Sequence, residues 1–299
     1  MKILSEHGND DLAKVYVASF GNGKKKMVEF AESLQPPHPI EKKWVLIVSS
    51  LFGCPVKCLM CDAGGGYSGR LSSDEILAQV DHMVTRRYPD RRLPQEKFKV
   101  QFARMGEPAL NPAVLDALEE LPRMLDAPGL TPCVSTIAPK GSEAFFERLL
   151  DIKDRLYPGG RFQLQLSIHT TDEAARDRLI SYPKWELEEI AAFGSRWKRD
   201  GDRKVTLNFA AAKGNPIDAK KVRQIFDPEI FLIKLTPMNP TRRAQESGLA
   251  SVIDPLDPST GQALKAAFEA EGFETILSIG EVEENQIGSN CGMYLNRVA

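Results

Sequence analysis

The sequence WVLIVSSLFGCPVKCLMC, residues 44–61, joins an apolar, β-branched run to three closely spaced cysteines. The run Trp44–Ser50 is typical of a buried strand, and Cys54, Cys58 and Cys61 follow directly on it. Thiolates are the usual protein ligands of iron–sulfur clusters. Three thiolates on one loop can hold three irons of a [4Fe–4S] cube, which leaves the fourth iron open to the amine and carboxylate of a substrate.

A structural zinc site is the alternative interpretation of these cysteines. Zinc normally takes four nitrogen or sulfur ligands, and no other His or Cys lies nearby, since Cys133 and Cys291 are distant in the sequence. The chain has five cysteines, and an odd number with a tight cluster argues against a disulfide framework. We therefore favour the iron–sulfur cluster.

Outward from residue 44, strand-like apolar runs alternate with segments of helical period. We expect strands at Trp44–Ser50, Lys97–Phe102, Pro132–Thr136, Arg161–Ser167, Lys204–Ala210, Phe231–Thr236 and Thr275–Ser278. We expect helices at Ser72–Tyr88, from Asn111 and Pro112 onward, and at Ser142–Tyr157, Trp185–Trp197, Asp218–Phe226 and Pro258–Glu271. Ser72 and Glu75 read as a capping box, and Asn111 as an N-cap. The alternation predicts an α/β fold, a partial (β/α)6 barrel of the TIM type, with its active-site groups at the C-terminal ends of the strands.

Three regions follow from this pattern. Residues 1–43 are expected to form a short N-terminal extension or hairpin, with strand-like segments near Val15–Phe20 and Met27–Ala31. Residues 44–236 form the partial barrel, and residues 237–299 form a C-terminal extension that carries Cys291.

Composition bears on whether the protein binds nucleic acid or a membrane. The formal net charge is -2, so the basic excess that usually accompanies phosphate-driven nucleic-acid binding is absent. No apolar run reaches the roughly 20 residues that span a bilayer, and the first residues do not read as a leader peptide. We expect a cytoplasmic, monomeric enzyme without a membrane partner.

A second motif, Met105-Gly106-Glu107-Pro108, follows the second strand. Gly106 permits close approach of the backbone, and Glu107 can accept a hydrogen bond from an ammonium group. The glycines of Gly64–Gly69 also match G-x-G-x-x-G. A dinucleotide fingerprint must follow a strand and open a helix, so we interpret these glycines as a close backbone approach beside the cysteine loop.

The cysteine spacing after a first strand, together with Gly-Glu-Pro after the second, resembles the radical-SAM superfamily. Further short motifs occur in the order typical of its RlmN/Cfr group of ribosomal RNA adenosine methyltransferases, over residues 28–295. These motifs are Val48–Cys54, Met105–Asn111, Val134–Thr136, Leu166–His169, Arg176-Asp177, Val205-Thr206, Thr236–Pro240 and Asn290–Gly292.

The resemblance implies roles for individual residues. The cluster would sit on Cys54, Cys58 and Cys61, and its open iron would chelate S-adenosylmethionine. Cofactor contacts would come from Gly106, Glu107, Ser135, Ser167, His169 and Asn239. Cys291 would carry a methyl group, which an adenosyl radical converts into the carbon that adds to adenine. Glu29 would match a carboxylate proposed as a proton acceptor. From its residue type alone, His169 is a general base, a supporting group or a structural histidine.

Two departures from the group stand out. Its second catalytic cysteine precedes the first cluster cysteine by seven residues, and Ile47 stands there. That cysteine resolves the covalent adduct, a task that Cys133 takes over only if its side chain points into the barrel. The group's N-terminal RNA-contacting domain is also expected to be missing, and Asn208 replaces a typical Glu.

The sequence thus predicts a radical S-adenosylmethionine enzyme that modifies an unactivated carbon, by methylation through Cys291. RNA adenosine is the leading substrate by resemblance, with an external electron donor of the flavodoxin or ferredoxin type. The first alternative is a radical enzyme that acts directly on a small molecule or peptide, and Ile47 and the near-neutral charge favour it. The second alternative is a non-enzymatic metal-binding protein.

Overall fold

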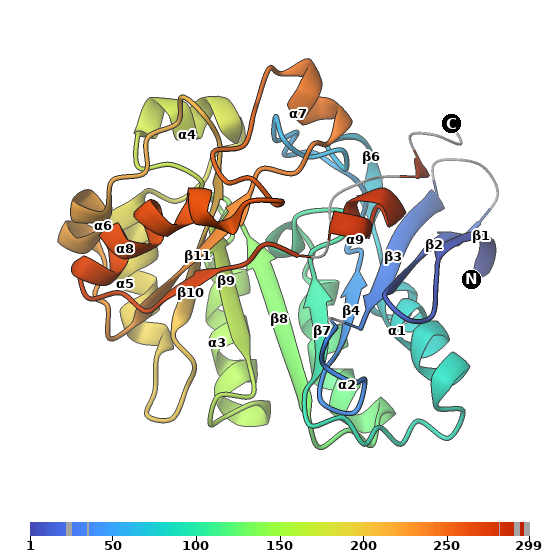
Figure 1. Ribbon diagram of the computed structural model, residues 1–299. Helices are drawn as coiled ribbons and strands as arrows, with labels where there is room; N and C mark the ends of the chain where they lie inside the picture. The colour runs from blue at the N-terminus through green and yellow to red at the C-terminus, as the bar shows by residue number, and fades with distance from the viewer. Residues whose placement is uncertain (22–25, 35, 281, 290–293, 296–299) are drawn as a thin grey trace.

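The computed structural model describes residues 1–21, 26–34, 36–280, 282–289 and 294–295. Its centre is a ten-stranded sheet in the order β1-β2-β3-β4-β7-β8-β9-β10-β11-β12 (Figure 1). Neighbouring strands from β4 to β12 are parallel, and β1 to β4 are antiparallel. Within the described residues, β1 and β12 do not pair with each other, so the sheet stays an open, partial barrel.

The strands of the sheet are β1 (Lys2–Gly8), β2 (Ala13–Ser19), β3 (Met27–Ser33), β4 (Trp44–Val48), β7 (Phe98–Phe102), β8 (Leu130–Thr136), β9 (Gln163–Ser167), β10 (Val205–Ala211), β11 (Phe231–Pro237) and β12 (Thr275–Leu277). A separate pair consists of β5 (Leu51–Cys54) and β6 (Gly65–Arg70). The helices are α1 (Ser73–Arg87), α2 (Ala113–Met124), α3 (Glu143–Leu156), α4 (Glu173–Leu179), α5 (Leu187–Trp197), α6 (Ala219–Ile225), α7 (Arg242–Glu246), α8 (Gln262–Ala270) and α9 (Val282–Ile287). Short 3-10 turns cover Pro108–Leu110 and Pro258–Gly261.

The predicted barrel is confirmed. All six expected barrel strands are present as β4, β7, β8, β9, β10 and β11, and the further strand is β12. The capping box of Ser72 and Glu75 is present at the start of α1. The helix α2 begins at Ala113, one residue later than expected, with Pro112 at the cap position. Asn111 Oδ1 still accepts a hydrogen bond from the Ala113 N–H at 3.2 Å. The Asn111 amide also donates to the backbone oxygens of Ser50 and Leu71, each at 2.8 Å, and so ties α2 to the cysteine loop.

The parallel strands have two chemically different faces. One face packs against the helices and is apolar; in β7 it consists of Phe98, Val100 and Phe102, all almost fully buried. The alternate residues of the same strand, Lys99 and Gln101, point to the other side. We call this second side the inner face. It carries Gln101, Cys133, Ser135, Gln163, Gln165, Ser167, Thr206 and Asn208, joined across strands by register and by side-chain contacts.

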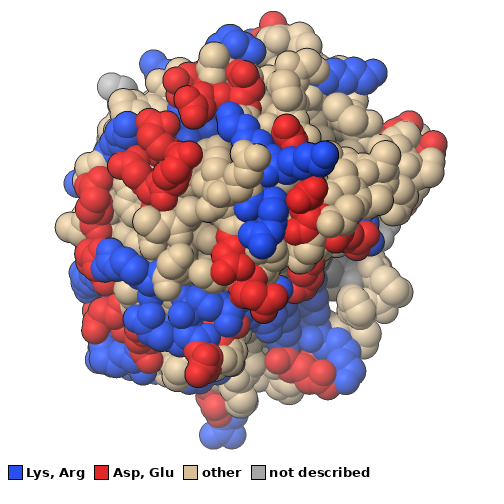
Figure 2. All heavy atoms as spheres, turned by 90° about the vertical axis from the view of Figure 1, so that its left-hand side faces the viewer, with Lys and Arg blue, Asp and Glu red and all other residues tan. Residues whose placement is uncertain are grey.

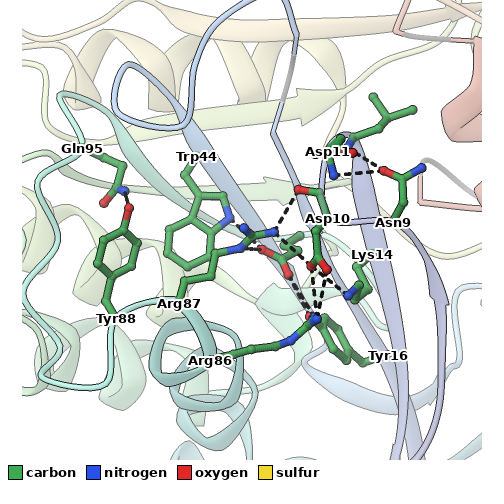
Figure 3. Close-up of polar contacts among 12 residues, drawn as sticks. Asn9, Asp10, Asp11, Lys14, Tyr16, Trp44, Arg86, Arg87, Tyr88 and Gln95 are labelled. Carbon is green, nitrogen blue, oxygen red and sulfur yellow. Dashed lines mark hydrogen bonds and ion pairs between the residues drawn. The ribbon is translucent and has the colours of Figure 1, made fainter.

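The antiparallel strands β1–β3 extend the sheet at its first edge, where the sequence predicted only a short extension. β1 was missed because its exposure alternates along a polar edge strand. A buried carboxylate, Glu32, anchors this region through Tyr16, Trp44 and Arg87, which are labelled in Figure 3. Tyr16 Oη donates to Glu32 at 2.7 Å, and Arg87 Nε on α1 donates at 2.7 Å. Trp44 Nε1 donates at 3.0 Å. Because a buried carboxylate must be paired, this network fixes the hairpin against β4 and α1.

The outer surface carries both signs of charge. Figure 2 shows Lys and Arg side chains interspersed with Asp and Glu over the face on the left of Figure 1, where α5, α6 and α8 lie. Several of these are exposed ion pairs, such as Arg196 with Glu147. A surface of alternating sign gives no broad attraction for a polyanion. Within the described residues, none of the helices has the length and apolar character needed to cross a membrane.

Candidate functional site

The cysteine loop begins inside β5 and is closed by β6. Cys54 pairs with Gly65, and the Cys61 N–H donates to the Cys58 backbone oxygen at 3.2 Å. Gly64 is tightly packed: a Cβ there would lie 2.7 Å from Arg243 Nη1 and 2.9 Å from Lys57 Cα. The predicted close backbone approach therefore holds for Gly64, whereas Gly65, Gly66 and Gly69 have positive φ and open space where a Cβ would stand.

Segments from the far end of the chain hold this loop in place. The Leu59 N–H donates to the Leu179 oxygen at 2.9 Å at the end of α4. Thr241 Oγ1, just before α7, donates to the Met60 oxygen at 2.8 Å. Arg243 on α7 donates to the Gly64 oxygen at 2.9 Å. The loop is thus fixed by residues that follow the fourth and sixth barrel strands, and these contacts were not predicted.

The surroundings of the thiols are apolar and electrostatically unfavourable for anions. Cys54 packs with Val56, Ile137, Leu179 and Ile180. Burial raises the pKa of Cys54 to about 12, and nearby Cys61 and Glu107 add to the effect. Burial and the neighbouring thiols also raise the pKa of Cys58 well above its ordinary value. Three thiolates on this loop would therefore require a positively charged partner such as a metal centre.

The donor set fits a cluster bound by three thiolates. Within the described residues, no three His, Cys, Asp or Glu side chains are gathered closely enough to hold a single metal ion. The assignment of Cys54, Cys58 and Cys61 as cluster ligands therefore rests on their donor type, their shared loop and the mutual effect of their charges. This assignment remains a proposal.

The Gly-Glu-Pro motif lies directly against the cysteine loop. The N–H groups of Ser50 and Leu51 donate to the Met105 oxygen at 2.8 Å and 3.1 Å. Gly106 has φ +98°, and a Cβ there would lie 2.5 Å from Leu51 Cβ. The charge of Glu107 raises the pKa of the Cys54 thiol, and the Glu107 backbone opposes this effect. The cysteine loop and the Gly-Glu-Pro motif, which are distant in the sequence, thus form one unit.

Glu107 is almost fully buried and is held by the end of β8. Its carboxylate accepts hydrogen bonds from the N–H groups of Ala109 and Ile137, each at 3.0 Å, and from the Thr136 hydroxyl. Burial raises the pKa of Glu107 to about 7, against the opposing effect of these donors. Much of its acceptor capacity is therefore used within the protein, so its contact with the ammonium of a cofactor stays a prediction.

The other predicted cofactor residues also lie at the C-terminal ends of strands. Ser135 and Ser167 are half-buried on the inner face of β8 and β9, and Ser167 pairs in register with Asn208. Asn239 follows β11, where its backbone oxygen accepts from the Thr241 N–H at 2.8 Å. The structure thus brings the strand-end residues to the edge that carries the cysteine loop. A direct role in cofactor binding remains a proposal for each.

His169 is held as a neutral, buried side chain. Its Nδ1 accepts a hydrogen bond from the Ala210 N–H at 3.1 Å, so the proton of the neutral ring lies on Nε2. Burial lowers its pKa to about 4, and nearby Arg176 adds to the shift. Its backbone has φ +67°. Of the three roles left open by the sequence, this geometry favours a supporting group that links β9 to β10.

Comparison with known proteins identifies relatives of this chain. No protein-family model matches the chain. A probable dual-specificity RNA methyltransferase RlmN of Thermosynechococcus vestitus is 30% identical over 69% of this chain and 58% of its own length. A probable RNA methyltransferase of Ectopseudomonas mendocina is 30% identical over 80% of this chain and 63% of its own length. The dual-specificity RNA methyltransferase RlmN of Wolinella succinogenes is 25% identical over 97% of this chain and 83% of its own length.

Solved structures share the fold. A radical SAM methyltransferase from Sphaerobacter thermophilus superposes with a TM-score of 0.72 at 19% identity, over 97% of this chain and 80% of that one. Streptococcus suis SuiB bound to S-adenosylmethionine gives a TM-score of 0.53 at 14% identity, over 78% of this chain and 49% of that one.

The chain is similar to RlmN-type RNA methyltransferases, which confirms the resemblance drawn from the motifs, and it shares the fold of a radical SAM methyltransferase. The chain spans 58% and 63% of the lengths of the two relatives that are 30% identical to it.

Glu29 is fully buried in β3, and its carboxylate is bound from two sides. Arg104 Nη2 donates to it at 2.9 Å, and the Leu295 N–H donates at 2.6 Å. Arg104 also donates to the backbone oxygens of Gly288 and Ser289, each at 2.7 Å. Cys291, the predicted methyl carrier, lies outside the described residues. The Glu29–Arg104 pair therefore binds the chain before and after the segment that contains Cys291. Arg104 itself was missed, although it immediately precedes the Gly-Glu-Pro motif.

The inner face contains the position of the missing second cysteine. Ile47, Gln101 and Cys133 lie in one row of the sheet on adjacent strands. Cys133 is fully buried, with its Sγ 4.0 Å from Ser135 Oγ. Strands are about 4.8 Å apart, so Cys133 stands roughly 10 Å from the Ile47 position. Because Cys133 pairs in register with Gln101 and alternates with the core residue Val134, its side chain points to the inner face. This orientation is required if Cys133 is to replace the second catalytic cysteine.

Several polar residues of the inner face were not predicted as site residues. They include Gln101 on β7, which donates to the Ser135 hydroxyl, and Gln165 on β9, which pairs in register with Ser135. A signal for them existed, because segments such as Phe98–Phe102 alternate apolar and polar residues. A parallel strand buried on both faces would read as continuously apolar. Strict alternation therefore indicates that one face is kept polar.

We expect Gly106→Ala to destabilise the protein by at least roughly 2 kcal/mol, because its Cβ would overlap Leu51 and because φ +98° disfavours a side chain. Gly141→Ala is the matched control: it also has positive φ, but nothing lies within 4 Å of its Cβ. Urea unfolding at fixed pH measures both. Equal losses in the two variants would show that the contact with Leu51 is unimportant.

A pH dependence follows from His169. Its folded pKa is depressed below the unfolded value, so the neutral ring contributes stability above about pH 6.5 that is lost as the pH falls toward 4. The loss across this window amounts to about 3 kcal/mol. His169→Asn removes the titration while tolerating φ +67°. Unfolding free energies at pH 7 and pH 4.5 should differ less in the variant than in the parent, and an unchanged difference would contradict the argument.

Proposed function

We propose that the protein is a radical S-adenosylmethionine enzyme that methylates an unactivated carbon. The single observation that supports this most strongly is the packing of the Gly-Glu-Pro motif against the cysteine loop, through the hydrogen bonds to the Met105 oxygen and the contact of Gly106 with Leu51. A structural metal site would explain the cysteines but not the placement of this motif against them. The names of the curated relatives support methyl transfer to RNA.

In this proposal Cys54, Cys58 and Cys61 hold a [4Fe–4S] cluster with one open iron for S-adenosylmethionine. When bound, the cluster and cofactor supply a carbon radical by reductive cleavage of the sulfonium, with the electron from an external flavodoxin- or ferredoxin-type donor. Gly106 provides the close backbone approach, and Ser135, Ser167 and Asn239 line the cofactor's side of the strand ends. The apolar residues around Cys54 exclude water from the reacting groups.

Cys291 is proposed as the methyl carrier for an adenosine-containing substrate; the names of the curated relatives give RNA as their substrate. Support comes from the Glu29–Arg104 pair, which binds the backbone on both sides of the Cys291 segment. Because Glu29 is engaged by Arg104 and by Leu295, positioning of this segment is its better supported role than proton acceptance. Cys133, on the inner face, is the candidate for the second thiol that Ile47 does not provide.

The test uses anaerobically reconstituted protein. The expected material is brown, contains about four irons per chain, and forms 5′-deoxyadenosine from S-adenosylmethionine and dithionite. Mass spectrometry of the chain should then locate a methyl group on Cys291. A colourless protein that contains zinc and no iron would contradict the proposal. Deoxyadenosine formation without a methyl group on Cys291 would instead favour direct radical chemistry on a small molecule, the candidate supported by Ile47 and by the net charge of -2.

A further inference from the structure

The inner face carries a group of lysines at the end opposite the cysteine loop. Lys97 and Lys99 lie two residues apart where β7 begins, and Lys43 directly precedes β4 beside them. Lys99 pairs in register with Val45 and with Thr131. Within the described part of the chain, Lys97 and Lys99 form no ion pair.

The charges of these lysines act on one another. Burial lowers the pKa of Lys97 to about 8, and Arg203, Lys99 and Lys43 lower it further. The carboxylate of Glu284 on α9 acts on Lys43 in the opposite direction and raises its pKa. Like charges held together at the end of a sheet face cost free energy unless an anion neutralises them.

A second, independent observation lies farther along the same face. The side-chain oxygens of Gln165 and Asn208 have no hydrogen-bond partner within the described residues. Gln165 is 7% exposed and Asn208 is 8% exposed. A buried carbonyl oxygen without a donor costs about 1–3 kcal/mol, so both oxygens are suited to N–H donors of a bound molecule. Asn208 pairs in register with Ser167, one of the proposed cofactor residues. Gln165 lies two residues before Ser167 on β9, farther from the C-terminal end of the strand.

We propose that the inner face binds a small phosphorylated molecule, with its phosphate on Lys97 and Lys99, its N–H donors toward Gln165, and its reactive end toward the cysteine loop. The last part rests on the proposed function. Three residues of β7 separate Lys99 from the strand's C-terminal end, a length of roughly 10 Å. A molecule the size of a nucleoside monophosphate bridges that length.

The charge pattern favours a terminal phosphate over the backbone of a nucleic acid. A phosphate monoester carries about -1.5 to -2 charges and three acceptor oxygens, which matches lysines gathered at one point. A polynucleotide carries one charge per phosphate along its length and is usually met by a basic surface. The chain has a net charge of -2.

Isothermal titration calorimetry of the reconstituted protein at pH 7 tests this inference, with adenosine 5′-monophosphate, adenosine and the dinucleoside phosphate ApA as probes. We expect the monophosphate to bind at least ten-fold more tightly than either of the others. The variant K97M/K99M should lose this preference. The matched control K213M/K220M replaces two exposed lysines outside the inner face and should keep it.

Lys99→Arg retains the charge and should retain most of the preference, which separates loss of the phosphate contact from loss of the fold. Equal binding of the three probes, or a preference that survives in K97M/K99M, would overturn the inference. Tighter binding of ApA would also overturn it, in favour of a nucleic-acid substrate. Deoxyadenosine formation is measured on the same preparation without a probe. If deoxyadenosine forms but the monophosphate is not preferred, only this inference is contradicted. If the monophosphate is preferred but no deoxyadenosine forms, only the proposed function is contradicted.

Discussion

Cys58→Ser should abolish the iron–sulfur cluster and, with it, the reductive cleavage of S-adenosylmethionine. Cys58 lies in the middle of the loop, and its thiol is affected by the charges of both neighbouring cysteines. A serine hydroxyl in this buried site does not ionise to replace the thiolate. We expect iron to fall far below about four per chain and 5′-deoxyadenosine formation to fall by roughly 100-fold or more.

Cys133→Ser is the control for this experiment, because Cys133 lies on β8 and not on the cysteine loop. It should keep its iron and should still cleave S-adenosylmethionine. Iron analysis measures the cluster content of both variants, and chromatography of 5′-deoxyadenosine measures the cleavage of S-adenosylmethionine. Loss of iron in Cys133→Ser to the same extent, or full cleavage by Cys58→Ser, would contradict the assigned ligand set. If Cys133 supplies the second thiol, Cys133→Ser should still form deoxyadenosine but should accumulate a covalent adduct with the substrate.

Glu29→Ala should cost about 3–5 kcal/mol of folding free energy. The Glu29–Arg104 pair is almost fully buried, with side chains 0% and 2% exposed. Removing the carboxylate leaves a buried guanidinium without its counter-charge and frees the Leu295 N–H. Urea unfolding of the protein, with and without reconstituted cluster, measures the loss.

Glu246→Ala is the matched control, because Glu246 pairs with Arg242 on the surface, where the side chains are 57% and 71% exposed. Exposed pairs contribute about 0–1 kcal/mol. The double variant Glu29→Leu/Arg104→Met should recover part of the stability, since an apolar pair of similar size can replace a buried ion pair. It should nevertheless lose the bonds to Gly288 and Ser289, which alkylation of Cys291 by a thiol reagent would report as a changed rate. Equal stability of Glu29→Ala and Glu246→Ala would refute a structural role for the pair.

The barrel was predictable because its strands and helices are encoded locally. The apolar face of Phe98–Phe102, the capping box of Ser72 and Glu75, and the spacing of strand–helix units each follow from nearby residues. The elements that were missed, such as β1 and α7, are short or exposed, and neighbouring segments hold them. The start of α2 was placed one residue too early, and the structure shows that the Asn111 side chain bonds both to the Ala113 N–H and to the backbone oxygens of Ser50 and Leu71.

The sequence alone determined the parallel α/β fold, the three thiols at the end of its first strand and the Gly-Glu-Pro motif after the second, because spacing along the chain and residue type encode these features. Only the tertiary structure decided that Glu29 is a buried ion-pair partner of Arg104, that Cys133 shares a row with Ile47, and that the lysines before and within β7 gather on the polar face. Those facts depend on strand register and on contacts between residues up to 266 positions apart. Side-chain burial and pairing across such distances arise only when the sheet assembles.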